Sequence, residues 1–109
     1  MSYFSYLISI LFRPRLVRHY PIHLNIEPTT ACNLSCHTCA HKHFIKKPSF
    51  LKLEMLKSII DECRPRKVSL NGLGETFLNK EIFEMIEYIK SKNIGLVTST
   101  NGTLLRERF

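Results

Sequence analysis

The stretch IHLNIEPTTACNLSCHTC, residues 22–39, decides the fold of this chain, because it joins a strand pattern directly to a cysteine-bearing loop. Apolar and polar residues alternate over residues 22–27, which is the period of a β-strand with one buried face. The loop that follows carries Cys32, Cys36 and Cys39 at the spacing C-x3-C-x2-C. The first feature predicted is therefore a strand whose carboxyl end runs into a ligand-rich loop.

The rest of the chain alternates helix and strand patterns. Pro65 must end the helix predicted over residues 53–63, because proline lacks a backbone N–H. Cys63 lies on the apolar face of that helix and is predicted to be buried. Asn79 is predicted to cap the second helix. The predicted strands are residues 22–27, 68–71 and 96–100, and the predicted helices are residues 53–63, a segment after Asn79, and residues 103–109. This alternation implies a parallel sheet with right-handed crossovers.

Polar residues occupy one face of each predicted strand, whereas fully buried parallel strands are normally apolar throughout. The apolar faces should meet the helices. The polar faces are formed by His23, Asn25, Glu27, Ser69 and Asn71, with Thr98 and Thr100. Two explanations stay open: these faces line a hydrated or ligand-filled interior, as in an incomplete barrel, or they are exposed because the sheet has only three strands.

The composition is that of one small globular domain. The 109 residues are 44% hydrophobic and 23% charged, which excludes a disordered chain. Lys and Arg number 16 against nine acidic residues, so the net charge is +7. Because the basic residues are scattered, a nucleic-acid partner rests on this charge alone. The longest apolar stretch, residues 3–12, falls short of the roughly 20 residues that a membrane-spanning helix needs.

Residues 3–12 predict an N-terminal helix. Its apolar stripe consists of Tyr3, Phe4, Leu7, Ile8 and Leu11. We expect this helix to pack on the rest of the protein. A helix lying on a membrane surface is the alternative, because Arg13 and Arg15 follow it. The predicted division is a helical extension over residues 1–20 and a core over residues 21–109.

Three cysteines in one short loop predict a metal centre instead of disulfides, and hence a reducing, cytoplasmic location. Thiolates suit zinc or an iron–sulfur cluster. The count of three is informative, since a cubane cluster held by three cysteines keeps one iron open for a small molecule. A zinc site would need a fourth ligand, for which the candidates are His37, His41 and His43.

Two further motifs follow the second and third predicted strands: residues 70–75 read LNGLGE, and residues 98–105 read TSTNGTLL. Together with residues 27–39, EPTTACNLSCHTC, they resemble the cysteine motif, the glycine–glycine–glutamate loop and the Thr-Asn-Gly segment of the radical S-adenosylmethionine (radical SAM) enzymes. The third motif is common in the molybdenum-cofactor and peptide-modifying (SPASM-like) branch. The resemblance covers roughly residues 22–105.

The resemblance implies a radical enzyme. Cys32, Cys36 and Cys39 would bind a [4Fe-4S] cluster whose open iron is chelated by S-adenosylmethionine. An electron from a reductant protein of flavodoxin or ferredoxin type would cleave that cofactor to a 5′-deoxyadenosyl radical, which would abstract hydrogen from a substrate. The implied cofactor contacts are Gly72, Gly74, Glu75, Thr38 and Asn101, with Gly74 and Glu75 at the methionine amino group. No catalytic residue is assigned.

The sequence departs from the family pattern in its details and its length. Thr38 stands where an aromatic residue is usual, Leu73 replaces a glycine, and Thr76 replaces a proline. The family core is a partial barrel of six βα units, whereas this chain holds about three. We therefore expect an α/β fold, the N-terminal portion of a partial (β/α)6 TIM-like barrel preceded by an N-terminal helix, with a second chain as a candidate source of the missing half. The alternative function is a non-catalytic metal-binding module that holds zinc or an iron–sulfur cluster.

Overall fold

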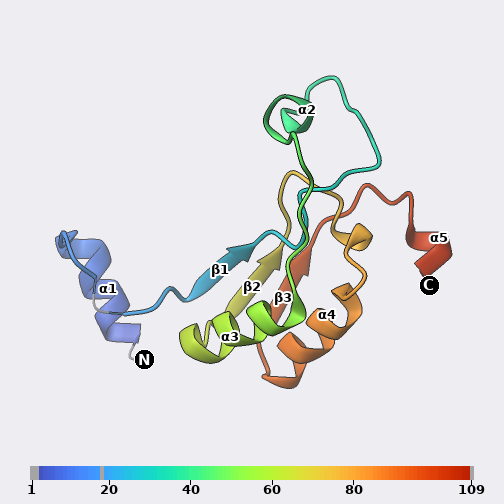
Figure 1. Cartoon of the computed structure of the whole chain (residues 1–109). Helices are drawn as coiled ribbons and strands as arrows, with labels where there is room; N and C mark the ends of the chain where they lie inside the picture. The colour runs from blue at the N-terminus through green and yellow to red at the C-terminus, as the bar shows by residue number, and fades with distance from the viewer. Residues whose placement is uncertain (1–2, 18, 109) are drawn as a thin grey trace.

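The computed structural model describes residues 3–17 and 19–108, and it confirms the predicted alternation of strands and helices (Figure 1). The helices are α1 (Tyr3–Phe12), α2 (His41–Phe44), α3 (Leu53–Cys63), α4 (Ile82–Ser91) and α5 (Leu105–Arg108), with a 3-10 turn η1 (Thr76–Leu78). The strands are β1 (His23–Ile26), β2 (Lys67–Leu70) and β3 (Gly95–Thr98). The short helix α2 lies inside the cysteine loop and is an addition to the prediction.

The three strands form one parallel sheet in the order β1-β2-β3. Leu24 pairs with Val68, and Val68 pairs with Leu96, so the middle strand is hydrogen-bonded on both sides. This order agrees with the parallel sheet that the alternation of strands and helices implies. Its consequence is that the loops after all three strands leave the same edge of the sheet, which is the edge that carries ligand sites in α/β proteins.

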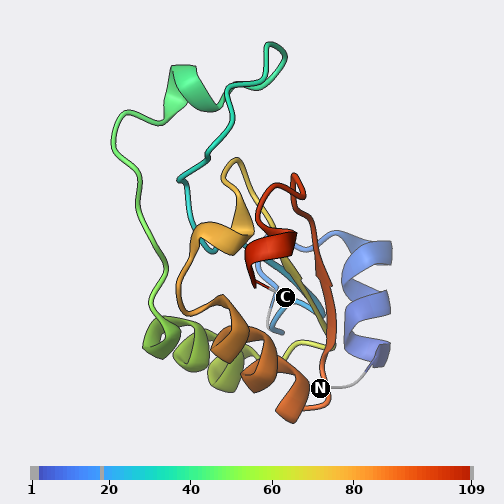
Figure 2. The same cartoon turned by 90° about the vertical axis from the view of Figure 1, so that its right-hand side faces the viewer.

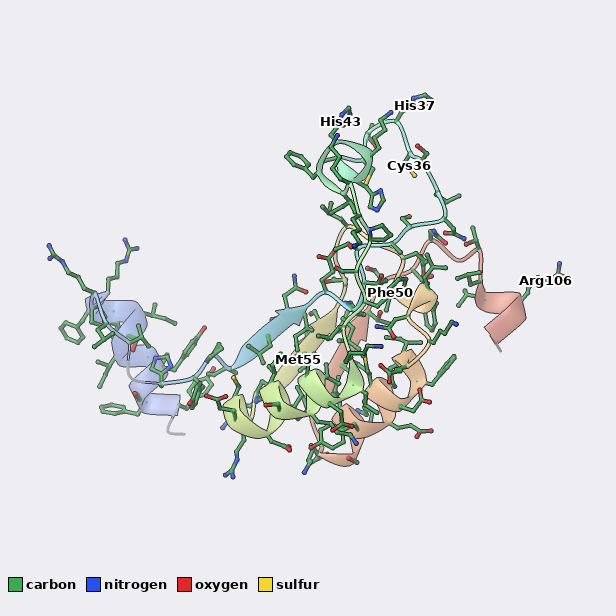
Figure 3. All side chains as sticks on the ribbon, viewed as in Figure 1. Cys36, His37, His43, Phe50, Met55 and Arg106 are labelled. Carbon is green, nitrogen blue, oxygen red and sulfur yellow. The ribbon has the colours of Figure 1, made fainter. Side chains whose placement is uncertain are left out.

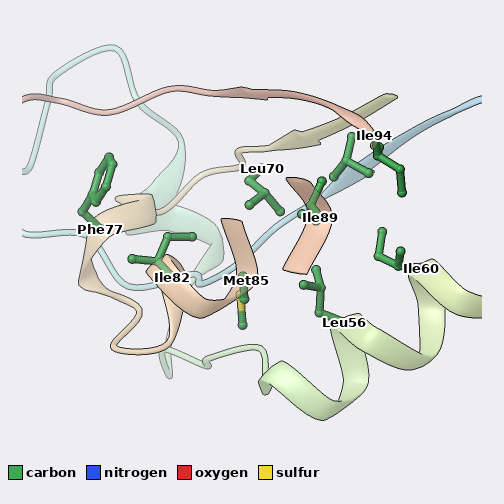
Figure 4. Packing of buried hydrophobic residues seen from close by; sticks show 9 residues of the cluster. Leu56, Ile60, Leu70, Phe77, Ile82, Met85, Ile89 and Ile94 are labelled. Carbon is green, nitrogen blue, oxygen red and sulfur yellow. The ribbon is translucent and has the colours of Figure 1, made fainter. Parts of the chain in front are cut away.

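The hydrophobic core lies between this sheet and helices α3 and α4, which cover the same face (Figure 2). Val68 and Leu70 of the middle strand are fully buried under the two helices. The other buried apolar residues, most of them shown in Figure 4, are Leu56, Ile60, Phe77, Ile82, Met85, Ile89 and Ile94. Burial of apolar area is the main stabilising term, so this one-sided layer holds the sheet together.

Helix α3 ends where the sequence predicts. Arg64 adopts a left-handed conformation with φ of 45°, and its N–H donates to the carbonyl of Ile60, before Pro65 prevents any continuation. The prediction of a buried Cys63 is wrong in degree: the thiol is half-buried, because this residue is the last of the helix and lies at the rim of the core.

Asn79 does not cap α4, contrary to the prediction, since the residue that precedes the helix is Glu81. The Asn79 side chain is instead buried and joins three segments. Its amide donates to the carbonyls of Pro28 (2.7 Å) and Leu51 (2.9 Å), and its Oδ1 accepts from the N–H of Glu81 (2.9 Å). The Asn79 amide thus pairs with backbone groups of three segments and fixes the base of the cysteine loop against the start of α4.

The second face of the sheet is open in the described residues. His23 and Asn25 are exposed there, and His23 Nε2 lies 2.7 Å from Ser69 Oγ. The sequence pattern predicts that Thr98 lies on this face, and that prediction is wrong. The register places Thr98 level with Leu70, on the helix side, and its hydroxyl donates to the Leu70 carbonyl (2.7 Å). Val97 takes the open-face position instead.

Helix α1 does not pack on the core, so that expectation is also wrong. None of its residues is buried, and Phe12 is 77% exposed. The segment between α1 and β1 extends away from the sheet and carries the helix past the amino end of β1 (Figure 1). Its contacts are peripheral: Arg66 stacks over the Tyr3 ring, and Ser9 is hydrogen-bonded to His19. Among the described residues, no helix has the length and apolarity needed to cross a membrane.

Candidate metal and cofactor site

Three loops meet at the carboxyl edge of the sheet. They are the cysteine loop after β1, the glycine loop after β2 and the Thr-Asn-Gly turn after β3. Parallel strands direct their carboxyl ends to one side, so segments that are about 35 to 70 residues apart in sequence become neighbours. Cys39, Glu75 and Asn101 therefore belong to loops that leave the same edge of the sheet.

The three cysteines of the motif are free thiols that line one small concavity. Cys32 and Cys39 are half-buried and Cys36 is exposed. We call this concavity the cysteine pocket, and its lining is Cys32, Leu34, Ser35, Cys36, Cys39, His41 and Lys42. Three soft sulfur donors on one loop are a ligand set that suits an iron–sulfur cluster or zinc.

Of the three histidines considered as a fourth ligand, His41 alone lines the cysteine pocket. Its Nε2 lies 2.6 Å from the Thr30 carbonyl, so that ring nitrogen already has a backbone partner. His37 and His43 are exposed, and Figure 3 shows both at the outer end of the loop, near Cys36. Within the described part of the chain, no three His, Cys, Asp or Glu side chains converge on a single metal ion.

The glycine loop is held by a residue that the sequence reasoning did not assign to the site. Glu27 Oε1 accepts from the N–H of Leu73 (2.5 Å) and of Gly74 (3.4 Å). A Cβ at Gly72 would overlap the Glu27 carboxylate, and a Cβ at Gly74 would overlap the Thr29 carbonyl. The two glycines are thus required by close approach of backbone and carboxylate, not by a left-handed conformation.

Glu75 is buried and already bonded within the chain. Its Oε1 accepts from Phe77 N (3.1 Å) and Thr100 Oγ1 (2.6 Å), and its Oε2 accepts from Asn101 N (2.7 Å). Its own N–H donates to the Ala31 carbonyl (2.8 Å). These three hydrogen bonds use part of the acceptor capacity of the carboxylate, and Glu75 still lines the concavity at this edge of the sheet.

Asn33 and Asn101 join the cysteine loop to the turn after β3. Asn101 Nδ2 donates to Asn33 Oδ1 (2.9 Å), and Asn33 Nδ2 donates to Thr103 Oγ1 (2.8 Å). Thr103 in turn donates through N and Oγ1 to Asn101 Oδ1 (3.0 and 2.7 Å). The three side chains form a closed set of hydrogen bonds that ties the Cys32–Cys36 segment to β3.

A second concavity, the edge pocket, lies beside the first and has a volume of about 280 Å³. It is lined by Cys32, Leu73, Gly74, Glu75, Ser99, Thr100 and Asn101. Cys32 lines both pockets, so a group held by the cysteines would border whatever occupies the edge pocket. Of the predicted cofactor contacts, Gly74, Glu75 and Asn101 line this pocket. Gly72 and Thr38 do not, and Thr38 is exposed on the cysteine loop.

The comparison with known proteins agrees with the placement of these motifs. Residues 26–109 match the Radical SAM superfamily. The chain belongs to the radical SAM superfamily. Members of this superfamily bind a [4Fe-4S] cluster and S-adenosylmethionine, which are the two cofactors predicted from the motifs.

Several curated radical SAM relatives are similar over most of this chain. Mycofactocin maturase MftC from Mycolicibacterium smegmatis is 33% identical over 97 residues, which cover 82% of this chain and 25% of the relative. A tungsten-containing aldehyde ferredoxin oxidoreductase cofactor-modifying protein from Pyrococcus furiosus is 27% identical over 91 residues, 80% of this chain and 26% of the relative. A probable GTP 3′,8-cyclase from Thermococcus kodakarensis is 34% identical over 88 residues, 77% of this chain and 28% of the relative. The chain thus spans about a quarter of the length of these relatives.

Sequence signals for the two side chains that the motif reasoning missed are present but weak. Glu27 is the last residue of the predicted alternating strand, and Asn33 follows the first cysteine. A glutamate at the end of a strand does not specify a hydrogen-bond partner about 45 residues away, and an asparagine after a cysteine does not specify one about 70 residues away. Only the parallel register, which aligns Ile26 with Leu70 and Leu70 with Thr98, brings the three loops into contact.

Proposed function

We propose that this chain forms the first part of a radical SAM core, in which Cys32, Cys36 and Cys39 hold a [4Fe-4S] cluster and the edge pocket receives S-adenosylmethionine. The observation that supports this most directly is the shared position of Cys32 in both pockets. A cluster with one iron free of protein ligands would then face the cofactor across Cys32. When bound and reduced, the cluster would supply the electron that cleaves S-adenosylmethionine to methionine and a 5′-deoxyadenosyl radical.

The residues of this chain would bind and position the cofactors. The thiols bind as thiolates, so cluster assembly releases protons and depends on pH. Gly74 and Glu75, with the backbone of the glycine loop, would meet the methionine amino group, since both residues line the edge pocket. Thr38 and Gly72 remain proposed contacts that would require the cofactor to extend beyond the edge pocket.

The division into an extension over residues 1–20 and a core over residues 21–109 is part of the same proposal. Among the described residues β1 and β3 are the edge strands of the sheet, and its open face carries polar residues. Further strands, from a longer chain or a second chain, would continue the sheet from β3 into a partial barrel. The substrate of the radical would bind against surfaces that those strands complete.

Anaerobic reconstitution with iron and sulfide tests the cluster directly. The wild-type chain is expected to bind about four irons and four sulfides, which is the content of a cubane cluster. Replacement of Cys32, Cys36 or Cys39 by Ala should abolish this content, whereas Cys63→Ala is the matched control that should not. Addition of S-adenosylmethionine should then change the electron paramagnetic resonance spectrum of the reduced protein.

The alternative function, a non-catalytic metal-binding module, gives a different result in the same experiment. Because His41 lines the cysteine pocket, a structural zinc site would use it as the fourth ligand. Retention of zinc without acid-labile sulfide, and loss of that zinc in His41→Ala, would contradict the radical SAM proposal and support the module.

A further inference from the structure

Helix α1 and the short segment that follows it take part in neither the core nor the proposed cofactor site. Ser5 and Ser9 are the two polar residues among the ten of the helix. The helix lies past the amino end of β1, whereas the cysteine pocket and the edge pocket lie at the carboxyl edge of the sheet (Figure 1). A binding function of α1 would therefore leave both pockets accessible.

The polar side of α1 faces the protein, and an apolar side faces outward. Ser9 Oγ lies 2.8 Å from His19 Nε2, and the Tyr6 ring packs edge-on against the His19 ring. Leu7 and Leu11 lie one turn apart on the opposite side, where they are 44% and 75% exposed. A surface helix of a globular protein normally has the reverse orientation, because burial of its apolar side is the favourable term.

The exposed apolar side chains continue beyond the end of the helix. Phe12, Leu16 and Val17 are all exposed, the first two by 77% and 74%. We call Leu7, Leu11 and these three residues the apolar surface of the N-terminal segment. Exposed apolar side chains that gather in one segment mark a site for contact with another protein or with a membrane.

Positive charge accompanies this apolar surface. The chain contains no acidic residue before Glu27, and Arg13, Arg15 and Arg18 follow directly after α1. Arg13 has a φ of 42°, a left-handed conformation at the end of the helix. The side chains of Arg13 and Arg15 are exposed, and neither takes part in an ion pair among the described residues. The segment thus presents exposed apolar side chains and unpaired guanidinium groups together.

We infer that α1 and the residues up to Val17 bind the surface of a bilayer that contains anionic lipids. The apolar surface would enter the boundary between headgroups and acyl chains, and the arginines would pair with lipid phosphates. Ten helical residues are about 15 Å long, which suits a helix that lies in the plane of the interface. A second copy of the chain fits less well, because two such segments would bring like charges together.

Vesicle binding tests the apolar part of this inference. The full 109-residue chain is mixed with vesicles of phosphatidylcholine, alone or with phosphatidylglycerol at about 30%, and the bound fraction is measured by co-sedimentation. The variant L11S/F12S alters the apolar surface. The matched control F44S/M55S also removes one aromatic and one aliphatic side chain, which are 73% and 56% exposed on α2 and α3.

A second pair of variants tests the charge. R13E/R15E alters the N-terminal segment, and the control K46E/K47E changes the net charge equally at two exposed lysines of the cysteine loop. We expect L11S/F12S and R13E/R15E each to lower the partition coefficient for anionic vesicles about tenfold, and each control to lower it less than about twofold. Binding of the wild-type chain should weaken between ionic strengths of about 0.01 and 0.15 M.

Fluorescence distinguishes immersion in the lipid from adhesion by charge. The chain contains no tryptophan, so a single introduced tryptophan reports its own surroundings. In Phe12→Trp the emission should shift to shorter wavelength when anionic vesicles are added. In the control Phe44→Trp the emission should stay unchanged. All the substituted side chains are exposed, so each variant should keep the circular dichroism spectrum of the wild-type chain.

Three results would overturn the inference. The first is failure of the wild-type chain to bind anionic vesicles. The second is an equal loss of binding in R13E/R15E and K46E/K47E, because the total charge would then explain the attraction. The third is a discrete dimer in analytical ultracentrifugation that is lost in L11S/F12S and persists, without binding, when vesicles are added. In that case the apolar surface would serve a second copy of the chain.

Discussion

At the scale of single residues, two carboxylates link the loops that form the candidate site. Glu27 accepts backbone N–H groups of the glycine loop, and Glu75 accepts from Phe77, Thr100 and Asn101. Hydrogen bonds to a charged acceptor contribute more than those between neutral groups. A motif glutamate that looks available for a ligand therefore acts here as a link between the loops after β2 and β3.

The role of Glu75 can be measured without any cofactor. Glu75→Gln replaces one carboxylate oxygen by an NH₂ group. That group must face either the Phe77 N–H and the Thr100 hydroxyl or the Asn101 N–H, so at least one hydrogen bond is replaced by a contact between two donors. We expect the free energy of unfolding of the chain to fall by about 1–3 kcal/mol, as measured by urea denaturation.

The matched control for that measurement is Glu87→Gln, which changes an exposed glutamate of α4 and should alter the free energy of unfolding by no more than about 0.5 kcal/mol. If Glu75→Gln were as stable as the control, the carboxylate would not be needed to link the loops after β2 and β3, and this prediction would be wrong.

At the scale of elements, α3 and α4 make the core, whereas the long N-terminal helix α1 does not. Leu56 of α3 and Met85 and Ile89 of α4 are fully buried against the sheet. Helix α1 has an apolar sequence but no buried residue. Hydrophobic composition alone thus does not place a helix in a core, because the connecting segment also decides whether the helix reaches a surface to cover.

Removal of residues 1–12 tests this division. Because α1 buries nothing, we expect the deletion to change the free energy of unfolding by less than about 1 kcal/mol. Exposed apolar side chains promote association, so the deletion should also reduce self-association in analytical ultracentrifugation. For comparison, Leu56→Ala should cost about 2–5 kcal/mol, because it leaves a cavity in the core.

A loss of stability on deletion as large as that of Leu56→Ala would show that α1 does pack on the sheet in solution. In that case the packing of the N-terminal helix on the rest of the protein, which the sequence predicts, would hold.

At the scale of the whole molecule, the chain is extended for its length. The Cα radius of gyration is 16.1 Å, whereas a compact domain of 100 residues has about 13 Å. The cysteine loop and α1 both project from the three-stranded sheet (Figure 1). A parallel sheet with an unpaired edge and one open face also leaves backbone groups available for pairing. These features agree with the proposal that further strands continue the sheet.

Catalytic competence should depend on that completion. A reactive radical needs a site that excludes water and holds the substrate at the reacting atom. We expect the reconstituted 109-residue chain to cleave S-adenosylmethionine slowly and without hydrogen transfer from a substrate. Addition of the remaining barrel, fused or as a second chain, should raise both thermal stability and turnover.

The assay for this prediction is anaerobic quantification of 5′-deoxyadenosine and methionine after addition of reductant. The chain without cluster, in which Cys36 is replaced by Ala, provides the background. Repeated turnover by the chain alone, with hydrogen taken from a defined substrate, would show that three βα units suffice.

The amino-acid sequence by itself determined the features that depend on near neighbours. The spacing of Cys32, Cys36 and Cys39, the end of α3 at Pro65 and the period of the strands are all set within a few residues, and the βα alternation implies a parallel sheet. These local patterns also carry the family membership, since the motifs that define it lie within short segments.

Only the tertiary structure decided which polar groups are satisfied by the chain and which are left for a ligand or partner. The bonds of Glu27 to the glycine loop, of Glu75 to Asn101 and of Asn33 to Thr103 join segments that approach one another because the strands are parallel and in register. The face on which Thr98 lies and the exposure of α1 have the same origin. A hydrogen bond between distant segments depends on the three-dimensional position of both partners, and residue type and spacing at either end do not specify that position.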